Sequence, residues 1–322
     1  MQELILEAVL IAIYAVGVGT ISSMVGIGGG VFNTPLLMII FLLHSQEAPA
    51  TALVAALFLA IASSFAYWRQ NPRPIIVKAG LFLAITTTPG SIIGVAFRTL
   101  IQDDFALRLI FGISLMPVAI KMLFAVRREK GDIASELANY SISNITDKRL
   151  AISLFGGFIG GVSAGLLGIG GGAVVVPVLS ILMGLPMHAA VATSMFIMVF
   201  TAASGTAMNL VSGYINPYYA ISLGLGMLLG AQFGSRLACK VNSVQLKRIF
   251  GIILVFPLVK MMKLGQLWLD PMDTNVLMST VGDVIIWLFI VTPIGLFRLY
   301  QLRKQSFVSG AKEELCDVPT PE

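Results

Sequence analysis

The stretch Gly26-Ile27-Gly28-Gly29-Gly30 interrupts a long apolar run, and it returns 142 positions later as Gly168-Ile169-Gly170-Gly171-Gly172. Each copy is followed at the same spacing by a proline and by a triplet of small residues: Pro35 and Pro177, then Ala50-Thr51-Ala52 and Ala192-Thr193-Ser194. Self-similarity at a fixed spacing indicates an internal repeat. The chain therefore contains one unit twice, followed by an additional C-terminal segment.

The composition around these stretches is typical of a membrane protein. Apolar residues make up 57% of the 322 residues and charged residues only 11%, which leaves too little polar surface for a soluble globule. The apolar runs outnumber those that a signal peptide and a single anchor would supply. They predict helical segments at residues 4–26, 30–43, 48–68, 75–97, 105–126, 150–168, 172–184, 187–210, 217–238, 245–263 and 281–302.

Two of these segments, 30–43 and 172–184, are shorter than the roughly 20 residues that a helix needs to cross the hydrocarbon. Each begins at a glycine stretch, so we expect broken, re-entrant half-helices there. The predicted fold is an all-α membrane protein. Its expected parts are a first transmembrane repeat over 1–126, a cytoplasmic linker over 127–149, a second transmembrane repeat over 150–264, and an extra helix with a cytoplasmic tail over 265–322.

The direction in which each repeat enters the membrane follows from its number of segments. Each repeat has about five hydrophobic segments, an odd number, so the second copy should enter from the opposite side. Inverted-topology repeats are the usual construction of secondary transporters, which bind substrate near the midplane and expose it alternately to the two sides. The sequence therefore predicts transport by alternating access.

The distribution of lysine and arginine predicts the orientation, because these residues are enriched in cytoplasmic loops. If the N-terminus lies outside, the cytoplasmic loops and the tail hold most of them: Arg69, Arg73, Lys78, Arg127, Arg128, Lys130, Lys148, Arg149, Arg236, Lys240, Lys247, Arg248, Arg298, Arg303, Lys304 and Lys312. We therefore expect a multi-pass protein of the cell inner membrane with its N-terminus outside and its C-terminus in the cytoplasm.

The glycine stretches are candidates for an anion site. In hydrocarbon a glycine-rich turn must be covered by protein or by a water-filled cavity, because its backbone groups need partners. Arriving from opposite faces, the two turns should meet within roughly 15 Å, half the hydrocarbon thickness. Each would present the free N–H groups of a helix N-terminus, which favour an anion. The alternative is that these glycines are helix contacts, as expected for Gly90-x-x-x-Gly94 and Gly226-x-x-x-Gly230-x-x-x-Gly234.

Charged residues inside the segments give the next constraint. No aspartate or glutamate lies deep in any segment, although a cation carrier or a carboxylate proton relay would normally need one. Lys121 is the most interior basic residue, and its long side chain can snorkel to the nearer surface. The same explanation is expected to cover Lys260, Arg98 and Arg236. These observations favour a small anion held by backbone N–H groups and hydroxyls.

The duplicated turns with their prolines, the Ala192-Thr193-Ser194 triplet and the hydropathy profile resemble the sulfite exporter TauE/SafE family over residues 4–264. This resemblance implies a membrane transporter that exports sulfite, sulfoacetate or related organosulfonates. The first copy departs from the more typical apolar second copy, because Asn33-Thr34 stands where the second has Val175-Val176. We therefore expect the first turn to supply the more polar side of the pocket.

The expected substrate-binding residues are the turn glycines and the polar residues near them: Ser22, Ser23, Gly26, Gly28, Gly29, Gly30, Asn33, Thr34, Thr51, Ser163, Gly168, Gly170, Gly171, Gly172, Thr193 and Ser194. Expected partners are the lipid bilayer, the small anion and, in a homodimer, a second copy of the chain. No nucleic acid, metal or cofactor is expected. An importer of the same anions stays open, with His44 and His188 as weak candidates for proton coupling. An intramembrane enzyme ranks below both, since two histidines without a buried carboxylate do not form a catalytic cluster.

Overall fold

The computed structural model describes residues 2–71, 73–101, 116, 147–238, 255, 259, 281–289 and 292–293. In these residues all regular structure is helical and there is no strand, which confirms the predicted all-α class. The chain separates into two compact units, Met1–Met262 and Lys263–Glu322. The second unit contributes the helical residues 281–289 and 292–293. The predicted segments 105–126 and 245–263, apart from single positions, and most of 281–302 lie outside the described residues.

The helices of the first unit follow the predicted segments within a few residues. They are α1 (Gln2–Val25), α2 (Gly30–Ile39), α3 (Glu47–Trp68), α4 (Val77–Leu100), α7 (Asp147–Leu167), α8 (Gly172–Pro177), a π-helical turn η2 (Val178–Leu182), α9 (Met187–Ser212) and α10 (Pro217–Ala238). Five helices contain stretches long and apolar enough to cross a membrane: Glu7–Val25, Glu47–Trp68, Val77–Leu100, Asp147–Leu167 and Met187–Ser212. Helix α10 is as long as α3, but its glycines, Gln232 and Arg236 make it less apolar.

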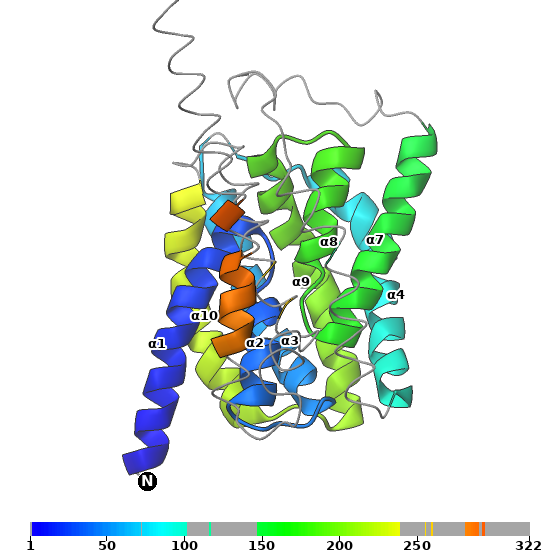
Figure 1. Ribbon diagram of the computed structural model, residues 1–322. Coiled ribbons are helices and arrows are strands. Elements are labelled where there is room, and N and C mark those ends of the chain that lie inside the picture. Colours follow the sequence, from blue (N-terminus) through cyan, green and yellow to red (C-terminus); the bar gives the residue numbers. More distant parts are fainter. Residues whose placement is uncertain are drawn as a thin grey trace, which may run out of the picture. The chain divides into compact units, whose positions relative to one another are not determined.

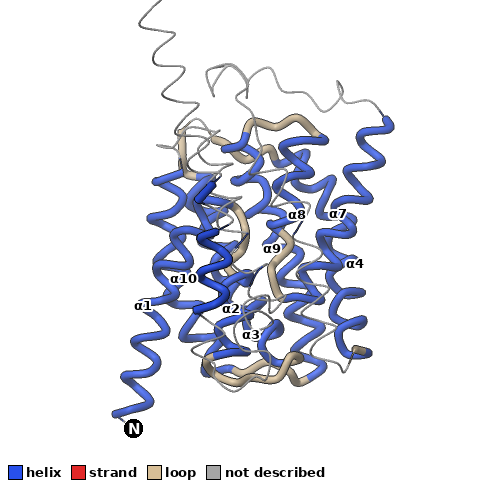
Figure 2. The backbone as a smooth tube through the Cα atoms, in the orientation of Figure 1, coloured by secondary structure: helices blue, strands red, loops and turns tan. Residues whose placement is uncertain are grey.

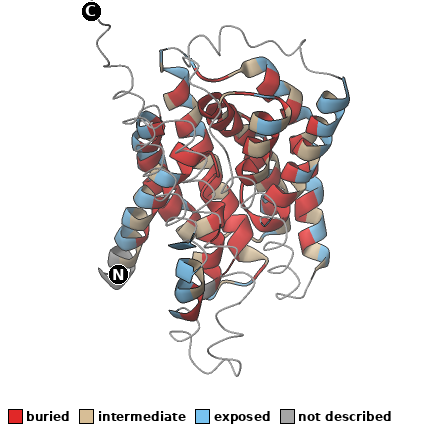
Figure 3. Cartoon of the chain, turned by 45° about the horizontal axis from the view of Figure 1, so that its top comes forward, coloured by how far each residue is buried: buried red, intermediate tan, exposed pale blue. Residues whose placement is uncertain are grey.

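The six long helices pack in the order α1, α10, α3, α9, α4 and α7. In Figure 1, α1 rises from the N-terminus at the bottom of the view, whereas α7 descends from the top. The short helix α2 packs on α3, and α8 packs on α7 and α9. Figure 3 shows buried residues gathered between the helices and exposed residues on the outward faces. Many of the outward residues are large and apolar, including Ile13, Ile85 and Phe155, as expected of a surface that faces lipid.

Glycines bring the outer helices close together. A Cβ on Gly90 of α4 would meet the carbonyl oxygen of Phe158 in α7 at 2.6 Å and the amide nitrogen of Val162 at 3.1 Å. Gly230 of α10 is placed in the same way against the backbone of Val16 and Thr20 in α1. Small residues allow such close packing in membranes, where burial of apolar surface does not drive helices together. The predicted helix contacts at these glycine repeats are thus confirmed.

The short helices are half-helices, as the sequence predicts. Helix α2 has 10 residues, which corresponds to about 15 Å or half of the hydrocarbon thickness. Helix α8 and its π-helical extension together run over Gly172–Leu182. Figure 2 shows the loops that precede them, at residues 26–29 and 168–171, inside the bundle and away from the loops at its two ends. The chain therefore turns back within the bundle twice.

Candidate functional site

The two glycine turns are in direct contact. A Cβ on Gly30 would collide with the carbonyl group of Gly168, and a Cβ on Gly172 would collide with the carbonyl oxygen of Gly26. A Cβ on Gly28 would lie 2.6 Å from the carbonyl oxygen of Ile169. The expectation that the turns meet in the interior is therefore confirmed. The close approach needs glycine on both sides, because the neighbouring atoms are backbone and cannot rotate away.

The backbone at each turn ends one helix and starts the next. Helices α1 and α7 end where Gly26 and Gly168 adopt left-handed conformations, with φ of 85° and 71°. This is a common helix C-terminus, because glycine has no Cβ that disfavours positive φ. The half-helices α2 and α8 then begin at the crossing, and neither has a side-chain cap. Two helix N-termini therefore lie against each other in the interior.

The crossing carries free hydrogen-bond donors. The carbonyl oxygen of Gly29 accepts from Phe32 and Asn33, each at 3.0 Å, and that of Gly171 accepts from Val174 and Val175, at 3.1 and 3.0 Å. The N–H groups of residues 28–31 and 169–173 have no acceptor among the described residues. Such N–H groups carry the partial positive charge of a helix N-terminus. The crossing is thus rich in buried donors without a described acceptor.

Four polar side chains surround the crossing. The Ser22 hydroxyl lies 3.5 Å from the position that a Cβ on Gly29 would occupy, and it is buried without a partner among the described residues. Thr34 donates to the carbonyl oxygen of Leu167 at 3.1 Å. The Ser194 hydroxyl lies 2.7 Å from the carbonyl oxygen of Val191 in its own helix and 3.3 Å from that of Gly26. Asn33 places its Nδ2 at 3.4 Å from the sulfur of Met227, and its Oδ1 has no described partner. Among these four side chains, Ser22 and Asn33 have a polar atom without a described hydrogen-bond partner.

The remaining four predicted polar residues are buried, and three of them have hydrogen-bond partners on other parts of the bundle. The Thr51 hydroxyl accepts the N–H of Asn216, just before α10, at 3.0 Å, and the Thr193 hydroxyl accepts the N–H of Ile76, just before α4, also at 3.0 Å. Ser23 donates to the carbonyl oxygen of Ala231 at 3.2 Å. Ser163 is buried in α7, five positions before Gly168. The structure thus places Thr51, Thr193 and Ser23 in contacts between helices.

Two methionines border the crossing and were not expected there. The sulfur of Met198 in α9 would meet a Cβ on Gly170 at 2.5 Å and would collide with one on Gly28. The side chain of Met227 in α10 occupies the corresponding space beside Gly29. Flexible methionines commonly fill irregular space in cores. Nothing in the sequence separates these two from the other methionines of the chain.

Comparison with known proteins identifies the family. A family model described as "Sulfite exporter TauE/SafE" matches residues 11–261, which contain both glycine turns. The chain belongs to the TauE/SafE family. As a member of this family it is a membrane transporter, and its apolar helices make it a multi-pass membrane protein.

Curated relatives of this TauE/SafE chain carry transporter names. It is 29% identical to the "Probable membrane transporter protein YunE" of Bacillus subtilis over 266 residues. This alignment covers 77% of this chain and 94% of the relative. A "Probable membrane transporter protein" of Methanocaldococcus jannaschii is 28% identical over 277 residues, covering 80% of this chain and 97% of the relative. One from Xylella fastidiosa is 24% identical over 242 residues, covering 74% and 88%. No solved structure is significantly similar to the chain.

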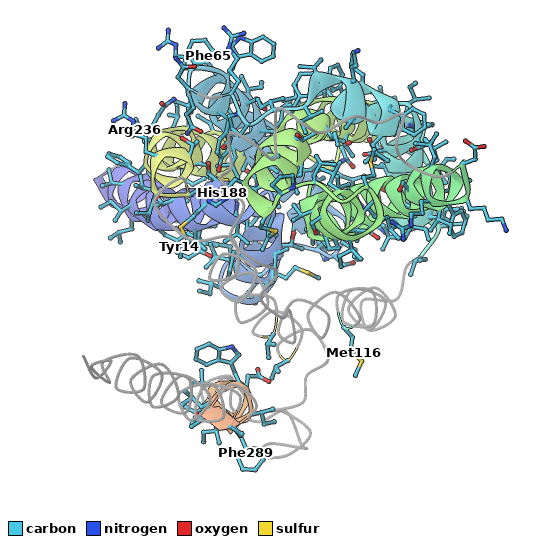
Figure 4. The ribbon with its side chains drawn as sticks, turned by 90° about the horizontal axis from the view of Figure 1, so that it is seen from above. Tyr14, Phe65, Met116, His188, Arg236 and Phe289 are labelled. Atoms are coloured by element: carbon cyan, nitrogen blue, oxygen red, sulfur yellow. The ribbon has the colours of Figure 1, made fainter. Side chains whose placement is uncertain are left out.

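Arg98 of this TauE/SafE member is not where the sequence placed it. We expected its side chain to snorkel to the outer surface, but Arg98 is 0% exposed. The expectation is wrong because this face of α4 is turned toward α7 and α9, which enclose the guanidinium group. Arg236 near the end of α10 does behave as expected and lies at the edge of the bundle in Figure 4, whereas the buried His188 lies inside it.

The hydrogen-bond partners of Arg98 in the described part of the chain are neutral. Its Nη1 donates to the carbonyl oxygen of Gly165 in α7 at 3.1 Å, and its Nη2 donates to Oδ1 of Asn209 in α9. Among the described residues of the first unit no carboxylate is buried; Glu7, Glu47 and Asp147 are partly or fully exposed. In the same part of the chain no group of three or more His, Cys, Asp or Glu residues could hold a metal ion. The buried charge near the second turn is therefore positive.

Proposed function

We propose that this transporter moves a small sulfur-containing anion, such as sulfite, sulfoacetate or another organosulfonate, out of the cell across the inner membrane. The observation that carries the proposal is the crossing of the two glycine turns, where two uncapped helix N-termini present N–H groups with no described acceptor. The description of the family model supports the choice of substrate class and of direction.

The chemistry of the crossing suits an oxyanion. Helix N-termini and runs of backbone N–H groups bind anions, because each N–H points at the ligand and the helix dipole favours negative charge. The three oxygens of a sulfite or a sulfonate group can accept several such N–H groups at once. The hydroxyl of Ser22, which lies beside Gly29 without a described partner, is an additional donor. A cation would find no buried carboxylate among the described residues of this unit.

Alternating access is supported by the matched packing of the two halves. Thr51 accepts the N–H that precedes α10, and Thr193, 142 positions later, accepts the N–H that precedes α4. The opposite directions of α1 and α7 in Figure 1 fit an inverted repeat. In such transporters one half rocks against the other around a fixed central site. The crossing of the turns would be that site.

The proposed orientation has support at the end of α3. The guanidinium of Arg69 lies 4.1 Å from the centre of the Phe65 ring, and that of Arg73 lies 5.4 Å from the Trp68 ring. Arginine is enriched in cytoplasmic loops, and aromatic residues are enriched at the headgroup level of the membrane. This end of the bundle would therefore face the cytoplasm, and the N-terminus would lie outside.

Flux into proteoliposomes tests the proposal. Purified protein is reconstituted, and its orientation is measured by protease cleavage of the 127–149 linker. Uptake of radiolabelled sulfite, sulfate, sulfoacetate and taurine is then followed. We expect sulfite or sulfoacetate to be transported and taurine, which also carries a cationic ammonium group, to be transported less. Export requires faster flux from the side that bears the linker.

Two controls make this result interpretable. Liposomes without protein give the passive leak, and the Gly17→Ala variant, altered at an exposed position of α1 away from the turns, should transport like the wild type. If no anion crosses faster than the leak, the proposal is refuted. Faster flux toward the side that bears the linker would overturn export and favour an importer.

A further inference from the structure

Arg98 has more hydrogen-bond donors than its surroundings use. A guanidinium group has five N–H donors and cannot be deprotonated in proteins. Two acceptors are recorded, the carbonyl oxygen of Gly165 and Oδ1 of Asn209. The Nε of Arg98 and the Nδ2 of Asn209 are both buried without a partner. The junction of α4, α7 and α9 therefore combines a buried positive charge with donors that lack acceptors.

Such an arrangement is costly unless a ligand completes it. Removing a charged group from water is costly, and neutral partners recover only part of the lost hydration. Each buried donor without an acceptor adds to this cost. Charged residues kept inside membrane segments despite this cost commonly mark substrate or ion pathways. An anion bound at Arg98 would supply both the missing charge and the missing acceptors.

The other half of the chain achieves the same packing without a charge. Tyr67, 142 positions before Asn209, donates its hydroxyl to the carbonyl oxygen of Ser23 at 2.8 Å. Ser23 in turn lies 142 positions before Gly165, the residue that accepts from Arg98. By the glycine matches of α4 and α10, the counterpart of Arg98 is Ala238, which is also buried. Helix packing at this position therefore does not require a cation.

Polar residues continue from Arg98 along the interface of α4 and α9. Thr87 and Thr201 are joined by a hydrogen bond of 2.9 Å between their hydroxyls. The hydroxyl of Ser91, buried without a partner, faces Gly205. The three positions of α10 that match Thr87, Ser91 and Arg98 carry only Met227, Ala231 and Ala238. At these three matched positions α4 is therefore polar and α10 is apolar.

The position of Arg98 relates it to the glycine turns. Gly165 precedes Gly168 by three residues, about 4.5 Å along a helix. Arg98 also lies in the last turn of α4, at the end that the proposed orientation places on the outer side. The site therefore lies between the second turn and the non-cytoplasmic surface.

We propose that Arg98 and Asn209 form a second anion site, which binds a small oxyanion on its way between the glycine crossing and the outer face. The ligand class is a sulfite, sulfate or sulfonate group, whose oxygens match the planar donors of a guanidinium. This inference rests on the proposed transport of such anions. It adds a positively charged site outside the crossing, whose own donors, backbone N–H groups and the Ser22 hydroxyl, are uncharged.

The competing explanation is an internal ion pair. Asp103 and Asp104 follow α4 in the sequence and lie outside the described residues, so a variant must test them directly. If Arg98 served to pair with either carboxylate, neutralising both would abolish the response to anions to the same degree as neutralising Arg98. If Arg98 binds the transported anion, removal of nearby negative charge should leave binding unchanged or strengthen it.

Binding is tested on the full-length protein in detergent, separately from transport. The melting temperature is measured against the concentration of sodium sulfite and sodium sulfate, with sodium chloride as the ionic-strength control. Wild-type protein should be stabilised by the oxyanions. Arg98→Gln keeps an N–H donor but removes the charge, and it should raise the half-saturating concentration at least about tenfold, equivalent to about 1.4 kcal/mol. Arg236→Gln, the same substitution at an exposed position of α10, should leave this concentration unchanged.

Asn209→Asp gives a sharper comparison, because it keeps the acceptor for Arg98 and supplies a permanent negative charge. Without ligand we expect it to be at least as stable as the wild type, and its half-saturating sulfite concentration should rise at least as far as that of Arg98→Gln. A half-saturating sulfite concentration that stays at the wild-type value in Asn209→Asp or Arg98→Gln would overturn the proposal. An increase in the Asp103→Asn/Asp104→Asn double variant equal to that in Arg98→Gln would also overturn it. If the wild type binds sulfite through Arg98 but gives no flux in liposomes, the transport proposal fails and the site stands. If flux persists with an unchanged KM in Arg98→Gln, the site fails and transport stands.

Discussion

The crossing of the glycine turns can be tested by adding one methyl group to it. Gly30 is the first residue of α2 and has no positive φ, so an alanine at this position would suit the local backbone. In space, however, the new Cβ would collide with the carbonyl oxygen of Gly168, and it would lie 2.8 Å from Cα of Ile169. These neighbours belong to the main chain of the second turn. The methyl group can be accommodated only by moving one half of the crossing.

The magnitude follows from two opposing terms. Overfilling a packed interior costs typically about 1–3 kcal/mol, and the upper part of this range applies where no side chain can rotate away. Alanine is favoured over glycine within a helix by up to about 1 kcal/mol. The net prediction for Gly30→Ala is a loss of about 2 kcal/mol, which corresponds to a melting temperature about 4–8 °C lower. Gly172→Ala should behave alike, because its Cβ would collide with the carbonyl oxygen of Gly26.

The control is Gly17→Ala in α1, where a Cβ would have no neighbour within 4 Å. The same helical preference applies there without the collision, so this variant should be neutral or slightly more stable. Melting is followed in detergent by size-exclusion chromatography after heating, and sulfite flux is measured on the same preparations. If the melting temperature of Gly30→Ala equals that of Gly17→Ala and is not below that of the wild type, the turns do not approach as closely as described.

Two further predictions separate structural hydroxyls from substrate-binding ones. Thr193→Val leaves the N–H of Ile76 without its acceptor, so it should cost about 1–3 kcal/mol of stability. The KM for sulfite should be unchanged. A raised KM at an unchanged melting temperature would instead place Thr193 in the substrate site. Ser22→Ala removes a buried hydroxyl that has no described partner, so its melting temperature should hold while the KM for sulfite rises several-fold. Ser212→Ala, whose hydroxyl bonds within its own helix, serves as the control, and equal KM values in the two serine variants would exclude Ser22 from the site.

Local sequence was sufficient to predict the helices and their interruptions. Apolar runs set the positions of α1, α3, α4, α7 and α9, and the glycine stretches with their prolines marked where α2 and α8 begin. These features depend on neighbours within a few residues, so they can be read along the chain. The contact between the turns was also predictable, because the duplication and the short segments left the turns no position outside the bundle.

The partners of individual side chains could not be predicted in the same way. Thr51 and Thr193 lie next to each repeat's half-helix in the sequence, which made them candidates for substrate binding. The structure instead gives their hydroxyls to backbone N–H groups at the starts of α10 and α4, at sequence separations of 165 and 117. Nothing in the sequence position of either threonine indicates these distant N–H donors.

The sequence alone determined that the chain crosses the membrane and turns back at two duplicated glycine stretches, with no carboxylate deep in a segment. Composition and periodicity are sufficient for this, because they decide which segments can enter a membrane. The fate of the charge on Arg98 was decided only by tertiary structure. A long basic side chain near a helix end can either reach water or be enclosed by other helices. For Arg98 the outcome depends on which face of α4 packs against the glycines of α7. The physical reason is that burial is a property of the neighbours on all sides, and here those neighbours come from α7 and α9, on the far side of the linker in sequence.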